Sequence, residues 1–254
     1  MPVKTLPVKT LPGLGPATRV RRAPLRLATP PAQRVVWVYA ITNDLGPHQF
    51  AGLAGVGGEP VRTVAEAGLT AVVGSVEARA FGEDALASLL DGLDNIERVG
   101  RAHHQVIARA AADGAPVLPL RLATVYPDDD TVRALLARRR GEFAGLLARF
   151  RDTVEWGVQV YGPADQQDGA GSLADTIDWV LADIADASQR QPDVDPRYVQ
   201  GPEQMILNAA YLLRGDRASE FLAAAHALAG ARVGIRADLN GPWPPYSFVD
   251  QLDA

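Results

Sequence analysis

Apolar residues along the chain follow the two-residue period of strands in some segments and the 3.6-residue period of helices in others. Residues 35–41 are β-branched or aromatic throughout, which is typical of a buried strand. Residues 61–76 predict two short strands joined by a turn at Ala67 and Gly68. An apolar run bounded by prolines predicts a further strand over residues 115–126.

Two longer segments in the same half show helical spacing. Residues 83–112 carry a single apolar stripe with alternating steps of three and four, made of Leu89, Leu93, Ile96, Gly100, His103, Ile107 and Ala110. Residues 128–150 predict one amphipathic helix with an inward face of Val132, Leu135, Leu136, Arg139, Phe143, Leu146, Leu147 and Phe150. Asp128, Asp129 and Asp130 would lie at the positive end of its dipole. Successive arginines at 138–140 fan around the axis, which indicates a solvated helix surface more than a basic patch.

The second half alternates strand and helix signals. Residues 153–162 alternate apolar and polar positions and predict a half-buried strand. A helix is expected to open with Ser172 and Asp175 as a capping pair, and its core stripe is Leu173, Ile177, Val180 and Ile184. A strand from Met205, a helix capped by Asp216 and ending at Gly230, and a strand over 231–239 complete the order. This order resembles the split β-α-β arrangement of ferredoxin-like folds.

The sequence therefore predicts an α+β fold with two domains. We expect an N-terminal α+β domain over residues 35–152 and a ferredoxin-like C-terminal domain over residues 153–240. An extended tail rich in proline and aromatic residues, 241–254, would follow. Residues 1–34 contain seven prolines, which argue against regular structure and predict a disordered tail. An organelle transit peptide is the alternative, although the segment lacks an amphipathic helix.

Charge is unevenly distributed along the chain. Residues 1–34 carry two Lys and five Arg without any Asp or Glu, whereas the whole protein has a net charge of −5. Without those seven cations, 18 basic residues face 30 acidic residues, which leaves the body at about −12. Such an acidic body is a poor binder of phosphate, so nucleic acid is not an expected partner. The basic tail could instead mediate self-association or contact with acidic partners.

Composition removes several other classes of function. The sequence has no cysteine, so disulfides, thiol catalysis and thiolate metal sites are excluded. No stretch reaches the length of a membrane span, and the N-terminus lacks the apolar run of a signal peptide. We therefore expect a cytoplasmic protein that does not contact a lipid membrane.

Few residues suggest chemistry. The Gly-rich segment 52–60 invites a phosphate-binding interpretation, but it lacks the Gly-Lys-Ser/Thr ending of a P-loop. His103 and His104 are adjacent, and neighbouring helical residues point about 100° apart, so they cannot chelate one ion together. His103 is expected to be a hydrogen-bonded core histidine, and His104 a surface residue. No catalytic residue, metal ligand or cofactor is expected.

Two features indicate contact with a partner or between domains. Trp179 falls on the acidic face of its helix, among Asp175, Asp183 and Asp186, and would need a second surface to cover it. That surface could belong to the other domain or to a separate protein. The segment GPWPPYSFVD, residues 241–250, is stiffened by its prolines and presents Trp243, Pro244, Pro245, Tyr246 and Phe248. It could pin itself to the protein's own surface, or it could receive a partner, alone or with an unpaired strand edge.

Several phrases, taken in order, resemble the gas vesicle F/L protein family: VYAI, RAHHQVIARAAADGAPVLPLRLATVYPDDDTV, EWGVQVY, LNAAYLL and GPWPPYSFVD. They span residues 35–250. The family pattern usually has Phe, Gly and Phe where this chain has Leu122, Ala123 and Tyr126. The resemblance implies a non-enzymatic accessory protein, associated with gas vesicles, that binds the major shell protein, and other accessory proteins could also be partners. It implies a role in nucleation or assembly of the vesicle wall.

One alternative class of function remains open at this stage. A small enzyme or ligand-binding protein could use His103 and Arg121 with a nearby carboxylate, Glu97 or Asp113. No Ser-His-Asp order, metal spacing or cofactor loop supports it. Glu97 also lies off the helical stripe that carries His103.

Overall fold

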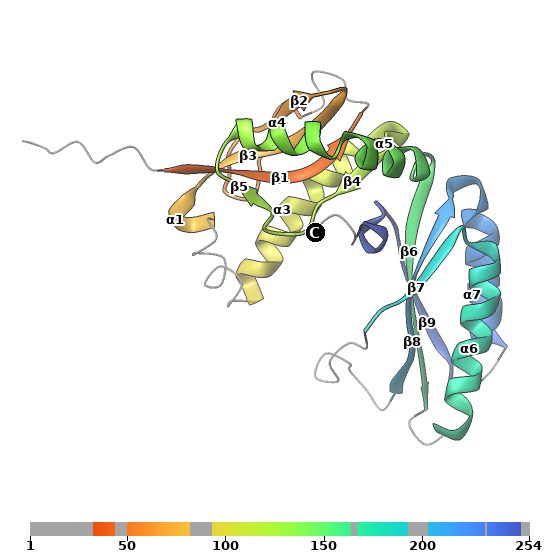
Figure 1. The fold of residues 1–254 in the computed structure, drawn as a ribbon. Coiled ribbons are helices and arrows are strands. Elements are labelled where there is room, and N and C mark those ends of the chain that lie inside the picture. Colours follow the sequence, from red (N-terminus) through yellow and green to blue (C-terminus); the bar gives the residue numbers. More distant parts are fainter. Residues whose placement is uncertain are drawn as a thin grey trace, which may run out of the picture. The chain divides into compact units, whose positions relative to one another are not determined.

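A computed structural model describes residues 33–43, 50–81, 93–163, 167–192, 203–231 and 233–249. The predicted N-terminal tail, with its proposed role in association, lies almost entirely outside these residues. Leu89 of the predicted apolar stripe also lies outside them. Within the described residues the fold is a mixed α+β arrangement with two antiparallel sheets, as the α+β prediction requires (Figure 1).

The first sheet is built from five strands in the order β2-β3-β1-β4, with β5 paired to β1. Their bounds are β1 Arg34–Thr42, β2 Val61–Glu66, β3 Leu69–Glu77, β4 Val117–Pro119 and β5 Val125–Tyr126. The predicted turn at Ala67 and Gly68 joins β2 to β3, and both residues have positive φ values. The helices of this half are α1 Ala78–Phe81, α3 Leu93–Ala110, α4 Asp129–Arg138 and α5 Arg140–Arg149.

A bulge in β1 divides its side chains between the two faces of the first sheet. The register with β3 shifts between Val38 and Ala40, so Tyr39 is the extra residue. Val36, Val38 and Ile41 pack in one core with α4 and α5. Trp37, Tyr39 and Ala40 pack in the other with α3. Both faces of β1 are therefore buried, which explains its unbroken apolar sequence.

Two predictions for this half are corrected. The strand expected over 115–126 is two short strands, β4 and β5, separated by a turn in which Ala123 has a φ of +73°. The helix expected over 128–150 is broken at Arg139, whose φ and ψ are −101° and 18°. Gly141 lies two residues further on, and its low helix propensity disfavours a continuous helix through this point.

The second sheet has the strand order β7-β8-β6-β9 and is antiparallel throughout. Its strands are β6 Thr153–Pro163, β7 Ala187–Arg190, β8 Glu203–Arg214 and β9 Arg236–Trp243. Helices α6 Gln167–Ile184 and α7 Ala218–Gly230 lie along one face of it (Figure 1). They bury Ile177, Leu181 and Phe221 against Val158, Val160 and Leu207 of the sheet.

Helix ends in this half differ from the predictions. Helix α6 begins at Gln167, so Ser172 lies inside it and does not cap it. Leu181 takes the fully buried position expected for Val180, which is half-buried. Asp216 belongs to a 3-10 turn, Gly215–Arg217, and no side-chain cap precedes α7. Strand β7 was not predicted, because its sequence ASQR carries no apolar alternation.

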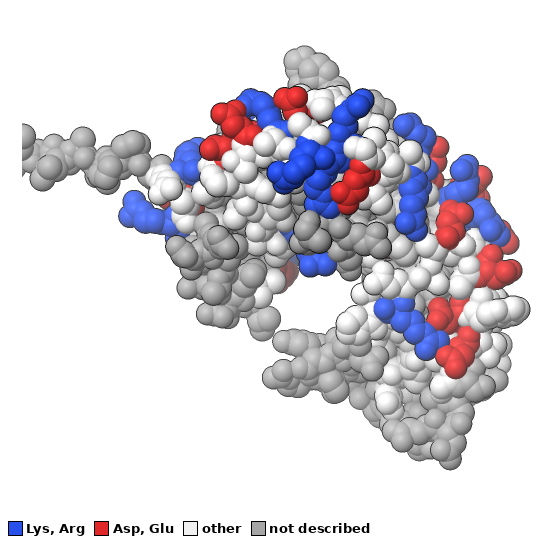
Figure 2. Space-filling model, in the orientation of Figure 1, with Lys and Arg blue, Asp and Glu red and all other residues white. Residues whose placement is uncertain are grey.

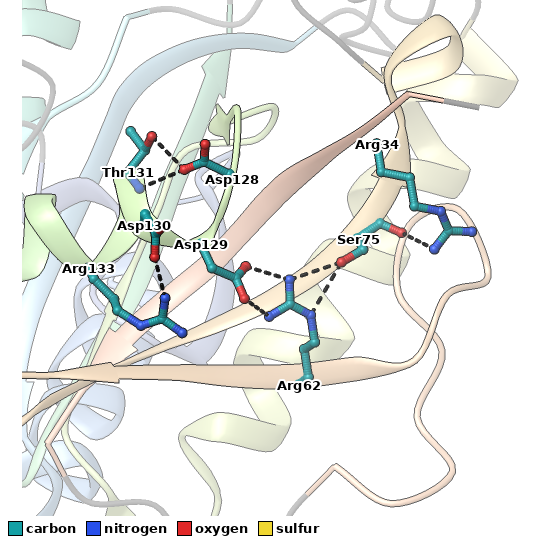
Figure 3. Close-up of polar contacts among 8 residues, drawn as sticks. All are labelled: Arg34, Arg62, Ser75, Asp128, Asp129, Asp130, Thr131 and Arg133. Atoms are coloured by element: carbon teal, nitrogen blue, oxygen red, sulfur yellow. Dashed lines mark hydrogen bonds and ion pairs between the residues drawn. The ribbon is translucent and has the colours of Figure 1, made fainter. Parts of the chain in front are cut away.

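An arginine clamp ties α4 to the first sheet (Figure 3). Arg62 of β2 makes a bidentate pair with Asp129, with Nη1 to Oδ2 at 2.9 Å and Nη2 to Oδ1 at 2.7 Å. Its Nη2 also donates to Ser75 Oγ of β3 at 2.9 Å. Asp128 caps the same helix by accepting from the backbone N–H of Thr131 at 2.8 Å, which lowers the pKa of the Asp128 carboxyl.

We expect Asp129→Asn to lower the free energy of unfolding by less than about 1 kcal/mol, because the pair is bidentate but screened by water. The side chains of Arg62 and Asp129 are 35% and 34% exposed. Asp130→Asn is the matched control, since Asp130 shares the first turn of α4 but its side chain is 91% exposed in its pair with Arg133. Urea denaturation at low and high salt measures both. Equal effects of the two substitutions would show that the clamp adds nothing beyond the helix dipole.

Candidate partner-binding site

The C-terminal segment 241–249, called the strap here, contains the aromatic and proline residues singled out in the sequence. The sequence predicts an extended segment, but the structure is not extended throughout. Strand β9 continues through Trp243, which pairs with Glu155 of β6. The chain then turns into a 3-10 helix, η4 Tyr246–Phe248. The N–H of Tyr246 donates to the carbonyl of Pro244 at 2.7 Å, which closes a tight turn centred on Pro245.

His104 of α3 contacts the two largest side chains of the strap. Its Nδ1 is hydrogen bonded to Tyr246 Oη at 2.8 Å, and its ring meets the Trp243 ring edge-on with centroids 4.9 Å apart. Burial lowers the pKa of His104. Burial also raises the pKa of Tyr246, which therefore keeps its phenol proton. His104 is thus half-buried under the strap and is not the free surface residue that was expected.

A buried carboxylate fixes the middle of the strap. Glu155 is 6% exposed, and it accepts hydrogen bonds from the backbone N–H of Ser247 at 2.8 Å and from its Oγ at 2.7 Å. Phe248 and Val249 pack against the core that α4 and α5 share with the first sheet. No local pattern in the sequence pointed to Glu155 or linked His104 to the strap, because their partners lie about 90 and 140 residues away in the chain.

Trp243 and its neighbouring prolines border a groove of about 450 Å³. Its other lining residues come from the end of α3, from β4, from the end of α5 and from the start of β6, and they include Ala108, Ala111, Val117, Phe150 and Val154. Pro245 is buried, whereas Trp243 is 39% exposed. The strap therefore has a pinned part, Tyr246 to Val249, and an accessible part that lines an apolar groove.

Trp179 lies apart from the strap in sequence and is the most exposed tryptophan, at 73%. It projects from α6 at one helical turn from Asp175 and from Asp183. All three side chains are exposed. No other part of the described chain covers the indole.

His103 occupies a closed position in the core. Trp37 Nε1–H donates to its Nδ1 at 3.0 Å, and its Nε2 lies 3.0 Å from the carbonyl oxygen of Leu120. Since Nδ1 accepts, the proton lies on Nε2 and the ring is neutral. Burial lowers the pKa of His103 to about 4. Both ring nitrogens are therefore occupied by the protein's own groups, as expected of a core histidine.

Two other residues of the enzymatic alternative, Glu97 and Arg121, are exposed, whereas His103 is buried. Glu97 is exposed and pairs with Arg101 one helical turn away. Arg121 is also exposed, and the side chain of Asp113 lies outside the described residues. In the part of the chain that the structure describes, no group of three or more His, Asp or Glu side chains could hold a metal ion. Among the described residues, Glu97 and Arg121 therefore do not share the buried position of His103.

The Gly-rich loop presents its amides to an internal carboxylate. Glu59 is 8% exposed, and its Oε2 accepts from the N–H of Gly57 at 2.8 Å. Its Oε1 accepts from the Tyr39 hydroxyl at 2.6 Å, and that hydroxyl accepts from the N–H of Val56 at 3.0 Å. Two loop amides that could have bound a phosphate are therefore directed to the chain's own groups.

Comparison with known proteins assigns the chain to a family. Residues 35–170 and 164–250 match the family model described as gas vesicle synthesis protein GvpL/GvpF. Gas vesicle protein L of Streptomyces sp. (strain CB03234) is 35% identical over 250 residues, covering 85% of this chain and 93% of that protein. Gas vesicle protein F of the same strain is 28% identical over 249 residues, with coverage of 84% and 99%.

Solved structures support the fold. The crystal structure of GvpF from Anabaena sp. PCC7120 superimposes with a TM-score of 0.70 at 18% identity, covering 85% of this chain and 96% of that one. GvpF from Microcystis aeruginosa gives a TM-score of 0.63 at 16% identity. Among the helices described, none has the length and apolar character needed to cross a lipid bilayer. The resemblance seen in the sequence is confirmed, and the chain belongs to the GvpL/GvpF family of gas vesicle proteins.

Proposed function

We propose that this protein is a non-enzymatic accessory or minor structural component of gas vesicles that binds the major shell protein. In this role it associates with gas vesicles and acts in nucleation or assembly of the vesicle wall. Membership of the GvpL/GvpF family supports the association with gas vesicles. The observation that carries the proposal is the divided strap, in which Trp243 stays 39% exposed beside an apolar groove while the following residues are pinned.

The proposed division of the chain follows the two sheets. Residues 35–152 would form one domain and residues 153–240 a second, with the strap crossing from β9 to α3. The element order of the second half, β6-α6-β7-β8-α7-β9, together with the sheet order β7-β8-β6-β9, supports a ferredoxin-like domain. A strap held at Glu155 and at His104 supports the idea that it also joins the two parts.

Different residues of the strap would hold it to the protein itself and bind the shell protein. Tyr246 and Phe248 face the protein's own core clusters, so their role is expected to be structural. Trp243 and Pro244 border the groove, so an apolar side chain of the shell protein could insert there. Proline pre-organises this part of the strap, which reduces the entropy lost on binding.

The test is co-expression of the full chain with the major shell protein, followed by measurement of co-purification. We expect Trp243→Ala to reduce retention at least tenfold while the melting temperature stays close to that of the parent, because a partly exposed aromatic at an interface contributes about 2 kcal/mol or more. Tyr246→Phe is the matched control, since it removes the hydroxyl that bonds His104 but keeps the ring.

The triple variant Trp243→Ala/Tyr246→Ala/Phe248→Ala should lower both the melting temperature and retention. If Trp243→Ala and Tyr246→Phe retain the shell protein equally well, the groove is not its binding site. If the parent itself retains none, the proposed partner is wrong.

A further inference from the structure

Strand β2 forms an edge of the first sheet, and no strand among the described residues lies on its outer side. It ends the order β2-β3-β1-β4 and pairs only with β3. Thr63 and Ala65 in the middle of the strand are exposed. This stretch has no proline, lysine or bulge, which are common devices that keep an exposed edge from pairing. The edge can therefore accept a further strand.

The turn between β2 and β3 determines which backbone groups point away from β3. Its two residues, Ala67 and Gly68, have φ values of +53° and +80°, and the residues on either side of them are paired. In a two-residue turn of this kind the flanking pair exchanges hydrogen bonds, so the even-numbered residues of β2 bond to β3. The N–H and C=O groups of Thr63 and Ala65 therefore point to the free edge, where no described residue bonds to them.

The two charged side chains of β2 are complementary to a second copy of the same strand. Arg62 and Glu66 have opposite charges, and they lie on the same face because four residues separate them. Arg62 is held by Asp129, but Glu66 makes no ion pair among the described residues. Two antiparallel copies of β2 can pair with Thr63 of one opposite Ala65 of the other. Arg62 of each copy then lies opposite Glu66 of the other.

Charge favours this register over its neighbours. Sliding one copy by two residues removes both ion pairs, and sliding it by four places like charges opposite each other. Sliding by an odd number of residues sets the outward backbone groups of one copy against the inward groups of the other. The nearby surface does not oppose the approach of a second copy, because residues of both charges are interspersed over α4, which the Arg62 clamp ties to β2 (Figure 2).

A cleft of about 710 Å³ lies where the hairpin tip of the second copy would be in this register. It is lined by residues 50–54 and by residues 58–63 along the start of β2. Ala67 of the second copy would lie opposite Val61, and Gly68 of the second copy opposite Pro60. Both tip residues are small, so the backbone of the tip can approach the cleft closely.

We propose that this protein forms a twofold-symmetric dimer in which the β2 edges of two copies pair and join their first sheets into one continuous sheet. The interface is isologous, so every contact in it occurs twice. A second copy is the occupant because the charges of β2 complement β2 itself. This inference goes beyond the proposed function, since it involves neither the strap nor the shell protein. Its test contains only this chain, so either proposal can fail without the other.

Sedimentation equilibrium of the full chain tests the proposal. We expect a monomer–dimer equilibrium with a Kd of about 10 µM, which corresponds to a small interface. Thr63→Pro removes the N–H that points to the second copy and should weaken the dimer at least tenfold. Proline is tolerated at this edge position, since the N–H bonds to nothing in the described chain. Thr63→Ala is the matched control, because it keeps the N–H, and it should change the Kd less than twofold.

A charge variant tests the same interface without altering the backbone. Glu66→Lys places a lysine opposite Arg62 twice in the dimer and should weaken it at least tenfold. Glu77→Lys makes the same change in net charge at an exposed residue of β3 beyond the end of β2, and it should change the Kd less than threefold. Circular dichroism checks that every variant is folded. An equal loss in the two lysine variants would show that only the overall charge matters and would overturn the proposal.

Cross-linking tests the register, because the chain has no cysteine of its own. In a mixture of Thr63→Cys and Ala65→Cys the two thiols lie on opposed residues whose Cα atoms are about 5.5 Å apart, within reach of a disulfide. In Ala65→Cys alone the two Cα atoms are more than about 7 Å apart, which is too far. We expect a cross-linked dimer in the mixture only. Equal cross-linking in both samples, a dimer unaffected by Thr63→Pro, or a monomer at about 200 µM would overturn the proposal.

Discussion

Gly74→Ala is expected to lower the free energy of unfolding by about 3 kcal/mol, from overpacking and lost hydrogen bonds at a buried carboxylate. Gly74 lies in β3 opposite Trp37 of β1. A Cβ at this position would lie 2.1 Å from Glu59 Oε1 and 2.9 Å from its Cδ. The carboxylate must therefore move, although it is 8% exposed and held by Tyr39 and Gly57.

Chemical denaturation measures this effect, and the chain offers two informative comparisons. Gly100→Ala should stabilise the protein by about 0.5–1 kcal/mol, because Gly100 lies inside α3 and a Cβ there meets no atom within 4 Å. Adding Glu59→Ala to Gly74→Ala should recover part of the loss, since the clash is then absent. If the free energy of unfolding of Gly74→Ala lies within about 0.5 kcal/mol of the parent value, the loop that carries Glu59 adjusts to the added methyl group more easily than its contacts indicate.

The second large effect is a loss of stability in mild acid caused by His103. In the unfolded chain this histidine titrates near its ordinary pKa of 6.5, whereas burial lowers the folded pKa to about 4. Below pH 6.5 the unfolded chain gains a proton that the folded chain does not bind, so stability falls as the pH drops toward 4. The full difference corresponds to about 3 kcal/mol.

Comparison with His103→Gln isolates this contribution from the carboxylates that titrate in the same range. Glutamine can accept from Trp37 and donate to Leu120, but it does not titrate. We expect the parent to lose about 3 kcal/mol more than this variant between pH 7 and pH 4, measured by urea denaturation at each pH. Parallel pH profiles would show that His103 is protonated in the folded state as readily as in the unfolded chain.

Local sequence patterns predicted the secondary structure well where one period applied over a whole element. The β-branched run of β1 and the turn between β2 and β3 needed no information from elsewhere in the chain. The stripe of α3 likewise predicted that His103 is buried. The break at Arg139 was missed, because the apolar spacing continues through it and only the backbone angles change.

The candidate sites divide in the same way. The sequence identified the residues of the strap and the exposure of Trp179, because proline density and a tryptophan among aspartates are visible in the order of residues alone. It could not show that Arg190, twelve residues beyond Asp178, folds back to bind Asp175 and Asp178 of α6. That contact depends on β7, a strand without an apolar pattern.

The sequence by itself determined the α+β class, the family and most helices and strands. These depend on the local spacing of apolar residues and on short sequence motifs, both of which are present in the order of residues. Only the tertiary structure decided which part of the strap is pinned and which is accessible. His104 bonds Tyr246 across about 140 residues of chain, and Glu155 bonds Ser247 across about 90. Contacts of that kind arise from the packing of whole elements, which no local pattern of hydrophobic and polar residues specifies.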